Sequence, residues 1–295
     1  MTRELIEKEV AMTVNPFHGQ SIILTGASSG IGRALALRLA GQGARLALAA
    51  RRTDRLETLA RECSDLGGEA LALPTDVADE AQCRHLVEET IAAFGGVDML
   101  INNAGIGVGS ALADLPDLHL FKQVMDVNFY GMVYCTYYAL LFLKQSRGRL
   151  VNISSLGGKM AIPFNTSYSA SKYAIHGFSD SLRLELAPAG VSVTVVCPYW
   201  VVTEFHEHFM NKDGQQKGAA GRAIYTDRMM TADRCAALVL QAAFKRRREV
   251  LMNPGPLAVW LKLAAPGLLD RLITATFLRP AIKRVTDHQN KTHGD

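Results

Sequence analysis

A tyrosine and a lysine four residues apart are the first pair in this sequence whose types and spacing indicate chemistry. They are Tyr168 and Lys172, in the run S-Y-S-A-S-K. Residues at this spacing share one face of a helix. A neighbouring ammonium favours the phenolate and lowers the pKa of a tyrosine, which is ordinarily about 10. The pair therefore predicts a tyrosine whose pKa is lowered, so that it can exchange a proton with a substrate.

Three glycines predict a place for a phosphate-bearing ligand. Gly26, Gly30 and Gly32 follow the apolar run 21–25 in the stretch T-G-A-S-S-G-I-G-R. Glycines between a strand and a helix let the backbone turn sharply and approach a diphosphate, which the N–H groups at the helix start then bind. The spacing differs from the G-x-G-x-x-G fingerprint, and a tight turn without a ligand is the alternative interpretation. A dinucleotide site is predicted because a strand precedes the glycines and an amphipathic helix follows them.

The end of the next apolar run indicates which dinucleotide is bound. At this position an acidic residue holds the ribose hydroxyls of NAD, whereas an arginine accommodates the 2′-phosphate of NADP. The run ends in Ala50, Arg51 and Arg52 without a carboxylate, and Arg33 adds a cation at the glycine turn. NADP(H) is therefore predicted in preference to NAD(H). The alternative is a pair of solvated arginines that open a helix.

Strands and helices must position these residues, and the apolar pattern predicts that the two alternate. Segments of helical period lie between the apolar runs, for example residues 31–42, 55–66 and 79–94. This alternation predicts a parallel sheet covered by helices on both faces. The expected fold class is α/β, a doubly wound, three-layer fold with a seven-stranded parallel sheet and a C-terminal helical tail. The predicted strands are residues 21–25, 45–50, 70–74, 98–102, 149–154, 192–197 and 249–252.

The chain is predicted to hold one domain with a segment on either side. Residues 1–15 form an N-terminal extension, residues 16–253 a Rossmann dinucleotide-binding and catalytic domain, and residues 254–295 an apolar and then basic helical tail. Within the domain, residues 199–230 are aromatic first and glycine-rich afterwards. A connection of this length and composition predicts a mobile lid over an apolar pocket, and hence a lipophilic substrate. The alternative is that the aromatic residues anchor the connection in the core.

Further motifs follow the glycine turn in a fixed order. They are Asp76, N-N-A-G at residues 102–105, Asn128 in M-D-V-N-F, Ser155, Tyr168 and Lys172. With T-G-A-S-S-G-I-G at residues 25–32, they make the chain resemble the short-chain dehydrogenase/reductase family, in its single-domain branch. The resemblance covers roughly residues 17–253, and the order and spacing of the motifs are jointly specific. It implies a seven-stranded Rossmann sheet, stabilised at its centre by the N-N-A-G segment, and a homo-oligomer, either a dimer or a tetramer.

The resemblance also implies a catalytic set of Asn128, Ser155, Tyr168 and Lys172. Hydride transfer to a carbonyl leaves negative charge on oxygen, which Tyr168 would protonate and Ser155 would bond and orient. Lys172 would hold the nicotinamide ribose, and Asn128 a water that carries protons to solvent. Asp76 would contact the adenine. The predicted cofactor-binding residues are Gly26, Ser28, Ser29, Gly30, Ile31, Gly32, Arg33, Arg51, Arg52, Asp76, Val77, Asn103, Ala104, Gly105, Tyr168, Lys172, Pro198, Val201 and Thr203.

One motif departs from the family pattern. The family commonly has P-G-x-x-x-T after the sixth strand, and this chain has Pro198, Val201 and Thr203 in place, but Tyr199 where the glycine stands. The shape of the nicotinamide pocket is therefore expected to differ from the family's.

Other candidate sites carry less weight. His206 and His208, beside Glu204 and Glu207, offer metal ligands, but no third ligand cluster accompanies them, and a solvated patch is the preferred interpretation. No metal site is predicted. A G-x-S-x-G stretch, which a Ser-His-Asp hydrolase would need, is absent from the sequence.

The tail allows two interpretations. Residues 255–284 hold two apolar segments of ten to twelve residues, each too short to span a bilayer. An apolar helical stripe there would pack on protein, which is the preferred interpretation, or lie on a membrane surface as a peripheral contact. The stripe is Leu268, Leu269, Leu272, Ile273 and Phe277, and the cations beside it are Arg271, Arg279, Lys283 and Arg284.

The basic run at residues 245–248 is predicted to end a helix, where its cations would meet the negative end of the helix dipole. A mild net charge of +4, with acids and bases interleaved, gives no argument for a nucleic-acid partner. Five scattered cysteines argue against disulfides, and the charged N-terminus lacks the apolar core of a secretory signal. A cytoplasmic location is expected, with membrane association through the tail as the alternative.

The leading hypothesis is an NADP(H)-dependent oxidoreductase that interconverts a carbonyl and a secondary alcohol on a lipophilic small molecule, such as a steroid, retinoid or acyl compound. A non-catalytic dinucleotide-binding sensor or scaffold is the alternative from another class. An epimerase or dehydratase on the same fold is the third, since fold does not fix function.

Overall fold

The seven apolar runs form one parallel sheet in the computed structural model, which describes residues 15–226, 229–252 and 254–278. The strand order is β3-β2-β1-β4-β5-β6-β9, and the predicted ends are correct to within one residue. Most of the strand residues are buried because helices cover both faces. The strands are β1 Ser21–Thr25, β2 Arg45–Ala50, β3 Glu69–Pro74, β4 Met99–Asn102, β5 Arg149–Ile153, β6 Ser192–Cys197 and β9 Glu249–Leu251.

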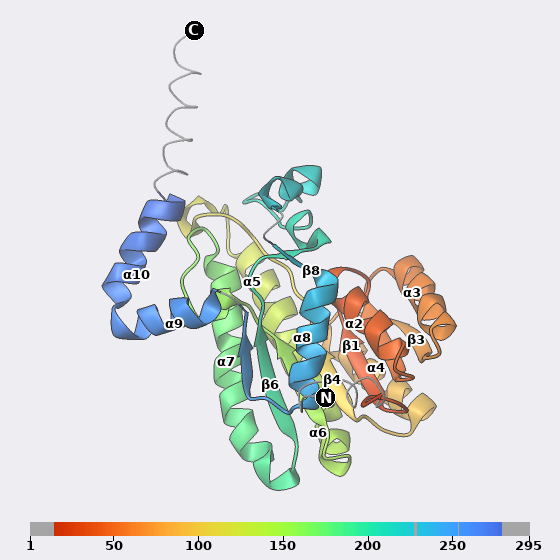
Figure 1. The fold of residues 1–295 in the computed structure, drawn as a ribbon. Coiled ribbons are helices and arrows are strands. Elements are labelled where there is room, and N and C mark those ends of the chain that lie inside the picture. Colours follow the sequence, from red (N-terminus) through yellow and green to blue (C-terminus); the bar gives the residue numbers. More distant parts are fainter. Residues whose placement is uncertain (1–14, 227–228, 253, 279–295) are drawn as a thin grey trace, which may run out of the picture.

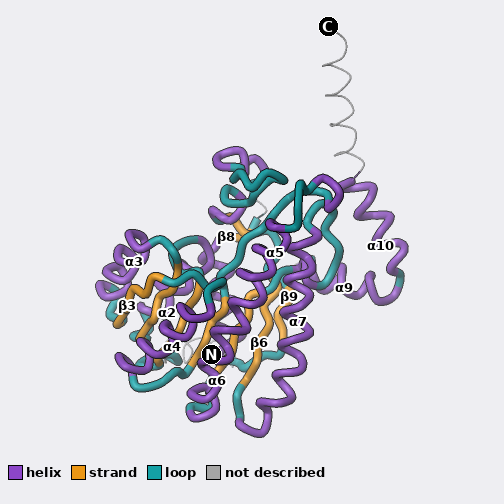
Figure 2. Tube along the Cα trace, turned by 180° about the vertical axis from the view of Figure 1, so that it is seen from behind, coloured by secondary structure: helices purple, strands orange, loops and turns teal. Residues whose placement is uncertain are grey.

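Helices cover the sheet on both sides, as Figures 1 and 2 show from opposite directions. Helices α2, α3 and α8 pack on one face through a cluster that includes Leu35, Leu59 and Val239. Helices α4, α6 and α7 pack on the other. The helices are α2 Gly30–Ala40, α3 Thr53–Asp65, α4 Glu80–Phe94, α5 His119–Met125, α6 Gly131–Gln145, α7 Thr166–Leu186, α8 Ala232–Phe244, α9 Gly255–Ala264 and α10 Pro266–Ile273.

The three layers confirm the predicted doubly wound Rossmann architecture. The chain runs outward from β1 to β3 in one direction and from β4 to β9 in the other, so the order reverses between β1 and β4. In open sheets of this kind, ligands bind outside the carboxyl ends of the strands at that point of reversal. The residues that follow β1, β4, β5 and β6 are therefore the ones to inspect.

Two short strands were not predicted. β7 Val201–Val202 pairs in parallel with β8 Met230–Thr231, at the two ends of the predicted lid. Between them lie 3₁₀ turns at Glu204–His206 and Gly218–Ile224. A strand of two residues is too short to show a period in the sequence. The lid thus begins and ends on a small sheet of its own.

The prediction for the basic run is wrong in its partners. α8 ends at Phe244, with Lys245 as its C-cap, so the cations lie beyond the last turn. Arg248 pairs with Asp180 at 2.9 Å. Arg246 donates to the carbonyls of Arg147, Gly148 and Gly190. Arg246 thus joins loops at one end of the sheet, Arg248 joins its own loop to α7, and neither arginine caps α8.

The described part of the tail is helical, as predicted, but its apolar stripe is split. Leu269 and Ile273 are buried, whereas Leu268 and Leu272 are about half exposed. Leu257, Trp260 and Leu263 on α9 are also exposed. On α9, Lys262 donates to the carbonyl of Lys159 and contacts Tyr173 on α7, which ties the tail to the domain.

The N-terminal extension lies outside the described residues except for residue 15, as do Arg279, Lys283 and Arg284 and the side chain of Phe277. Among the helices that the structure describes, none has both the length and the apolar character to cross a bilayer. Membrane contact and oligomeric state both stay predictions.

Candidate active site

Ser155 and Tyr168 meet at the carboxyl end of β5. Ser155 is the second residue after the strand, and its Oγ accepts a hydrogen bond from the Gly157 backbone N–H at 3.1 Å. Tyr168 lies in the first turn of α7, and its ring and the Ser155 Oγ both border Gly157, at 3.4 and 3.5 Å from the place of a Cβ there. The predicted serine and tyrosine therefore lie together, at the edge of the sheet where a ligand is expected.

Lys172 lies one turn further along α7, as its spacing predicted. Its Nζ stands 5.6 Å from the centroid of the Tyr168 ring and donates to the Ile153 carbonyl at 3.0 Å. The side chain is buried, and this burial lowers the pKa of Lys172 to about 8. A buried ammonium with one carbonyl partner retains donor capacity, since it carries three N–H groups.

The predicted direction of the Tyr168 pKa is wrong for this arrangement. Burial raises the pKa of Tyr168, the hydrogen bond with Ser155 lowers it by less, and the net pKa lies above the ordinary value. Aromatic rings of the lid cause part of this burial: Phe205 and Phe209 lie 5.8 and 6.5 Å from the Tyr168 ring, centroid to centroid. The phenol therefore stays protonated near neutral pH.

Asn128 lies in a short π-helical segment, Asp126–Tyr130, between α5 and α6. Single π-helical turns of this kind are frequent at functional sites. Its side-chain amide exchanges two hydrogen bonds with the backbone of Ile106, and its Nδ2 also donates to Ser171 Oγ at 3.0 Å. Ser171 in turn donates to the Tyr168 carbonyl at 2.7 Å. Asn128 is thus fixed against the start of α7, within the same cluster as Tyr168 and Lys172.

The glycine turn has the geometry of a phosphate cradle. Gly26 and Gly30 have φ values of +65° and +54°, which L-residues with side chains rarely adopt. Ser29, the N-cap of α2, has no side-chain cap hydrogen bond, so the first N–H groups of the helix remain donors for a ligand. These features fit a dinucleotide diphosphate at the predicted turn, beside Ile31 and Gly32.

The three arginines predicted to bind the cofactor lie in different surroundings. Arg52 donates to the hydroxyls of Ser28 and Ser29 at 2.9 Å each and so lies against the glycine turn. Arg33 instead pairs with Glu62 on α3 at 2.7 Å. Arg51 is exposed at the end of β2. Of the three predicted arginines, Arg52 is the one that the structure places on the cradle.

The N-N-A-G segment joins β4 to its neighbours, as predicted. Asn102 donates to Asn152 on β5 at 2.9 Å, and Asn103 donates to the carbonyls of Thr25 and Gly26. The Ala104 N–H donates to Thr25 Oγ1 at 3.1 Å. Gly105 lies beside the side chains of Asn128 and Lys172. The segment therefore links the glycine turn to the catalytic cluster.

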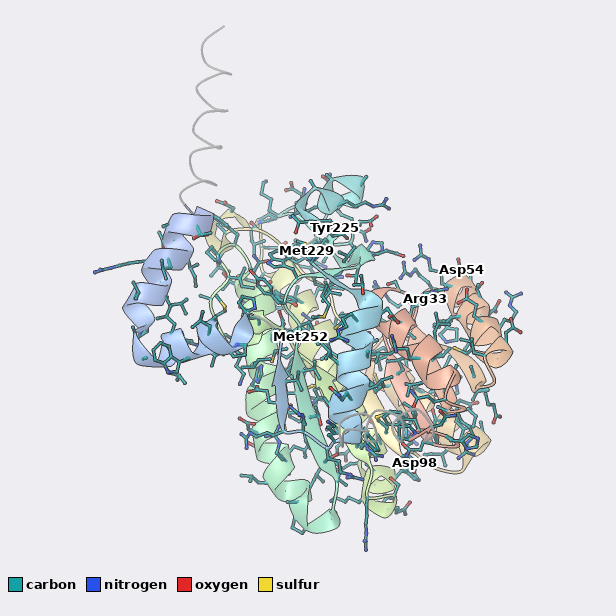
Figure 3. All side chains as sticks on the ribbon, viewed as in Figure 1. Arg33, Asp54, Asp98, Tyr225, Met229 and Met252 are labelled. Atoms are coloured by element: carbon teal, nitrogen blue, oxygen red, sulfur yellow. The ribbon has the colours of Figure 1, made fainter. Side chains whose placement is uncertain are left out.

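The remaining predicted cofactor residues lie along the same edge. The half-buried Asp76 accepts from the Ala78 N–H at 3.1 Å, and Val77 is buried against Gly131. Three further residues follow β6: Pro198, whose carbonyl accepts from the Leu156 N–H, the buried Val201, and Thr203, which lies against Gly30. Figure 3 shows Arg33 and Tyr225 at this end of the molecule, and Asp98, which precedes β4, at the opposite end.

The lid lies over Tyr168 through its aromatic half. Phe205 and Phe209 contact each other at 5.7 Å, and the Phe209 ring packs so closely on Gly107 and Gly109 that a side chain at either glycine would collide with it. Tyr199, which stands in place of the family's glycine, is 41% exposed and contacts Trp200 edge to face. The sequence did not single out Phe205 or Phe209, although both belong to the aromatic stretch of the predicted lid.

The prediction that His206 and His208 form a solvated patch is wrong, because both side chains have defined partners. His206 lies 5.2 Å from the Trp200 ring, and burial lowers the pKa of His206. His208 Nε2 lies 3.3 Å from Arg52. Glu207 pairs with Arg222 at 2.9 Å. The two histidines therefore serve different contacts within the lid and at the cofactor edge.

A polar cluster of His176, Cys197 and Glu249, one helical turn from Lys172, was not predicted from the sequence. His176 on α7 lies 3.1 Å from Ser154 Oγ, just after β5, 3.7 Å from Cys197 Sγ on β6 and 3.4 Å from Glu249 on β9. Imidazole, thiol and carboxylate atoms within 4.8 Å of one another are potential metal ligands. The Lys159 ammonium already pairs with Glu249 at 2.7 Å, and burial raises the pKa of Cys197 to about 12. This charge pattern favours an ion-pair network over a cation site.

The cluster predicts a stability loss in acid. Burial alone raises the pKa of Glu249, but hydrogen bonds from His176 and Lys159 outweigh it and lower that pKa from 4.5 to about 2. Because the folded carboxyl is the stronger acid, its contribution is complete above pH 4.5 and is lost as pH falls towards 2. Glu249→Gln should destabilise the protein by about 3 kcal/mol at pH 7, measured by urea unfolding.

The matched control is Glu185→Gln, an exposed carboxyl on α7. Its effect should stay below about 0.5 kcal/mol. The difference between the native protein and Glu249→Gln should fall to about half at pH 3, where the carboxyl of the unfolded chain is mostly protonated. A difference that is the same at pH 7 and pH 3 would contradict the assigned role of Glu249.

The fold and this edge define the protein as a dinucleotide-binding oxidoreductase with a serine, tyrosine and lysine set. Residues 20–214 match the profile of the family described as short chain dehydrogenase. The chain belongs to the short-chain dehydrogenase/reductase family. Members of this family are oxidoreductases that act on CH–OH groups with a nicotinamide dinucleotide.

Individual relatives agree with this assignment. The chain is 34% identical over 266 residues to 11-beta-hydroxysteroid dehydrogenase A of Sesamum indicum, covering 88% of this chain and 76% of that protein. It is 34% identical over 262 residues to dehydrogenase/reductase SDR family member 7B of Mus musculus, covering 86% and 80%. A short chain dehydrogenase/reductase from Burkholderia phymatum, solved in complex with NAD, superposes with a TM-score of 0.77 at 29% identity, covering 86% and 96%.

Proposed function

We propose that the protein is an NADP(H)-dependent oxidoreductase that interconverts a carbonyl and a secondary alcohol on a lipophilic small molecule of the steroid class. The observation that carries the proposal is the convergence of Ser155, Tyr168, Lys172 and Asn128 at the carboxyl edge, beside the glycine turn. The relatives named as 11-beta-hydroxysteroid dehydrogenases support the substrate class.

The chain's own residues would divide the work as follows. Ser155 would bond the substrate oxygen, and Tyr168 would donate a proton to it as negative charge develops there. Tyr168 is protonated at neutral pH, as the donor in a carbonyl reduction must be, although burial, which raises its pKa, makes it a weaker acid. Lys172 would bind the nicotinamide ribose through the N–H groups that do not donate to the Ile153 carbonyl. Asn128 would hold a water for proton exchange with solvent.

The cofactor would lie along the switch point of the sheet. The N–H groups of Ser29, Gly30 and Ile31 would hold the diphosphate, and Arg52 would hold a 2′-phosphate. Asp76 and Val77 would line the adenine side. When bound, NADP(H) supplies or accepts the hydride.

The lid supports an apolar substrate. Phe205 packs tilted, and Phe209 edge to face, against the Tyr168 ring, so a substrate oxygen that reaches Tyr168 would have apolar surface beside it. Exclusion of water from the Tyr168 hydroxyl would strengthen its hydrogen bond to the reacting oxygen. A flat, apolar ketone or alcohol fits this environment better than a sugar does.

The test is a substrate panel followed by the loss or gain of NADPH fluorescence. Ketosteroids should be turned over, whereas sugars of similar size should not; turnover of long-chain 3-ketoacyl esters without turnover of ketosteroids would overturn the steroid class. Binding of NADPH without turnover of any carbonyl or alcohol would favour a sensor or scaffold. Conversion of a compound without net change in NADPH would favour an epimerase or dehydratase.

A further inference from the structure

The carboxylate of Glu204, in the lid, lies among several cationic side chains at the edge of the sheet where the cofactor is proposed to bind. Arg55 Nη1 donates to Glu204 Oε2 at 2.6 Å, and Arg52 Nη1 lies 3.4 Å from the same oxygen. His208 Nε2 also lies 3.4 Å from this carboxylate. One anionic oxygen therefore sits among three groups that can carry positive charge, at the place where β2 ends.

The position of Glu204 is fixed by its neighbours in the chain. Thr203 lies against Gly30, so close that a side chain at this glycine would stand 3.0 Å from the Thr203 Cβ. Thr203 Oγ1 also accepts from the Phe205 N–H at 3.3 Å and caps the 3₁₀ turn Glu204–His206. These contacts of Thr203 hold Glu204 beside the glycine turn.

The charges at this edge make Arg52 a shared partner. Its Nη2 binds the hydroxyls of Ser28 and Ser29, which leaves Nη1 to face Glu204. Burial raises the pKa of Glu204, but the hydrogen bond and charge of Arg55 and the charge of Arg52 outweigh it and hold that pKa below its ordinary value. The carboxylate is therefore ionised at neutral pH and repels a second anion placed on Arg52.

We propose that Glu204 is an internal competitor for the 2′-phosphate of the cofactor and sets the selectivity between NADP(H) and NAD(H). This inference rests on the proposed cofactor site. A 2′-phosphate would bind the guanidinium of Arg52 as a carboxylate does, with charge-assisted N–H···O bonds. To do so it must displace Glu204 from Arg52 or share the arginine with it. Arg55, at the shorter distance, keeps the carboxylate nearby in either case.

The test measures a binding ratio, so no turnover is needed. Adenosine 2′,5′-bisphosphate and adenosine 5′-monophosphate differ only in the 2′-phosphate, and their dissociation constants are measured by titration calorimetry on the full chain. Glu204→Gln should raise the preference for the bisphosphate about tenfold, as expected for removing one like charge a few ångströms from a phosphate. The affinity for the monophosphate should change less than about twofold.

The control variant is Glu207→Gln, three residues along the same lid segment but paired with Arg222. It should leave the ratio unchanged. Glu204→Ala repeats the test with the side chain removed and should shift the ratio in the same direction. Because both nucleotides are measured on each variant, a folding defect would weaken both and is separated from a change in selectivity.

The outcomes distinguish this inference from the proposed function. If the native protein prefers the bisphosphate and neither Glu204 variant changes the ratio, the inference is wrong and the NADP(H) preference stands. If the native protein prefers the monophosphate but Glu204→Gln raises the ratio about tenfold, the inference stands and the NADP(H) preference is wrong. An equal change of the ratio in Glu207→Gln would mean that any negative charge in the lid has this effect, and it would overturn the specific role of Glu204.

Discussion

Tyr168→Phe should lower kcat for carbonyl reduction by about a thousandfold or more, while NADPH still binds. The substitution removes the hydroxyl and keeps the ring that Phe205 and Phe209 contact. The proton for the developing alkoxide must then come from water, which is a weaker acid than a phenol. Single-turnover rates with a ketosteroid give the chemical step, and quenching of protein fluorescence gives NADPH affinity.

Tyr173→Phe is the matched control for this prediction. Tyr173 lies on the same helix, is 39% exposed, and contacts Lys262 of the tail. Its loss removes a surface contact and should leave kcat within about twofold. Retained turnover in Tyr168→Phe would remove Tyr168 from its role as general acid. Loss of NADPH binding together with turnover would instead indicate a disturbed α7.

The sequence could predict the fold because its signals are local. Strands buried on both faces appear as continuous apolar runs, and the glycines after β1 mark the turn that begins α2. The spacing of Tyr168 and Lys172 likewise determines that both lie on one face of α7. Each of these inferences uses residues a few positions apart, for which the backbone geometry is known in advance.

The direction of the Tyr168 pKa could not be predicted in the same way. The sequence gives the spacing to Lys172, but not that Lys172 turns to the Ile153 carbonyl or that lid rings bury the phenol. Burial and charge act on a tyrosine in opposite directions. Their balance depends on residues 205–209, some forty positions away in the sequence.

Contacts between distant segments were missed for the same reason. Glu204 meets Arg52 across 152 positions, and the cluster of His176, Cys197 and Glu249 joins one helix to two strands. From the sequence, Glu204 was considered only as a neighbour of His206 and His208 in a possible metal site. An acid directly after the Thr203 motif, in a chain with arginines after β2, is the signal that would have led to this contact.

Gly32→Ala should cost about 3 kcal/mol of unfolding free energy and abolish nucleotide binding. A methyl group at Gly32 would lie 2.1 Å from the Gly26 carbonyl oxygen and 2.7 Å from Asn103 Nδ2. The oxygen belongs to backbone held at a φ of +65°, so either α2 or the glycine turn must move. Urea unfolding measures the stability, and titration with adenosine 5′-monophosphate measures the state of the cradle.

Gly177→Ala provides the opposite case within the same chain. Gly177 is exposed in the middle of α7, and a methyl group there would meet nothing within 4 Å. The helix should gain about 1 kcal/mol, because alanine has the higher helix propensity, and nucleotide binding should be unchanged. The two substitutions add the same atom, so opposite signs would trace the cost at Gly32 to the close approach of β1 and α2. If Gly32→Ala were as stable as the native protein and still bound nucleotide, that close approach would not be what holds the cradle in shape.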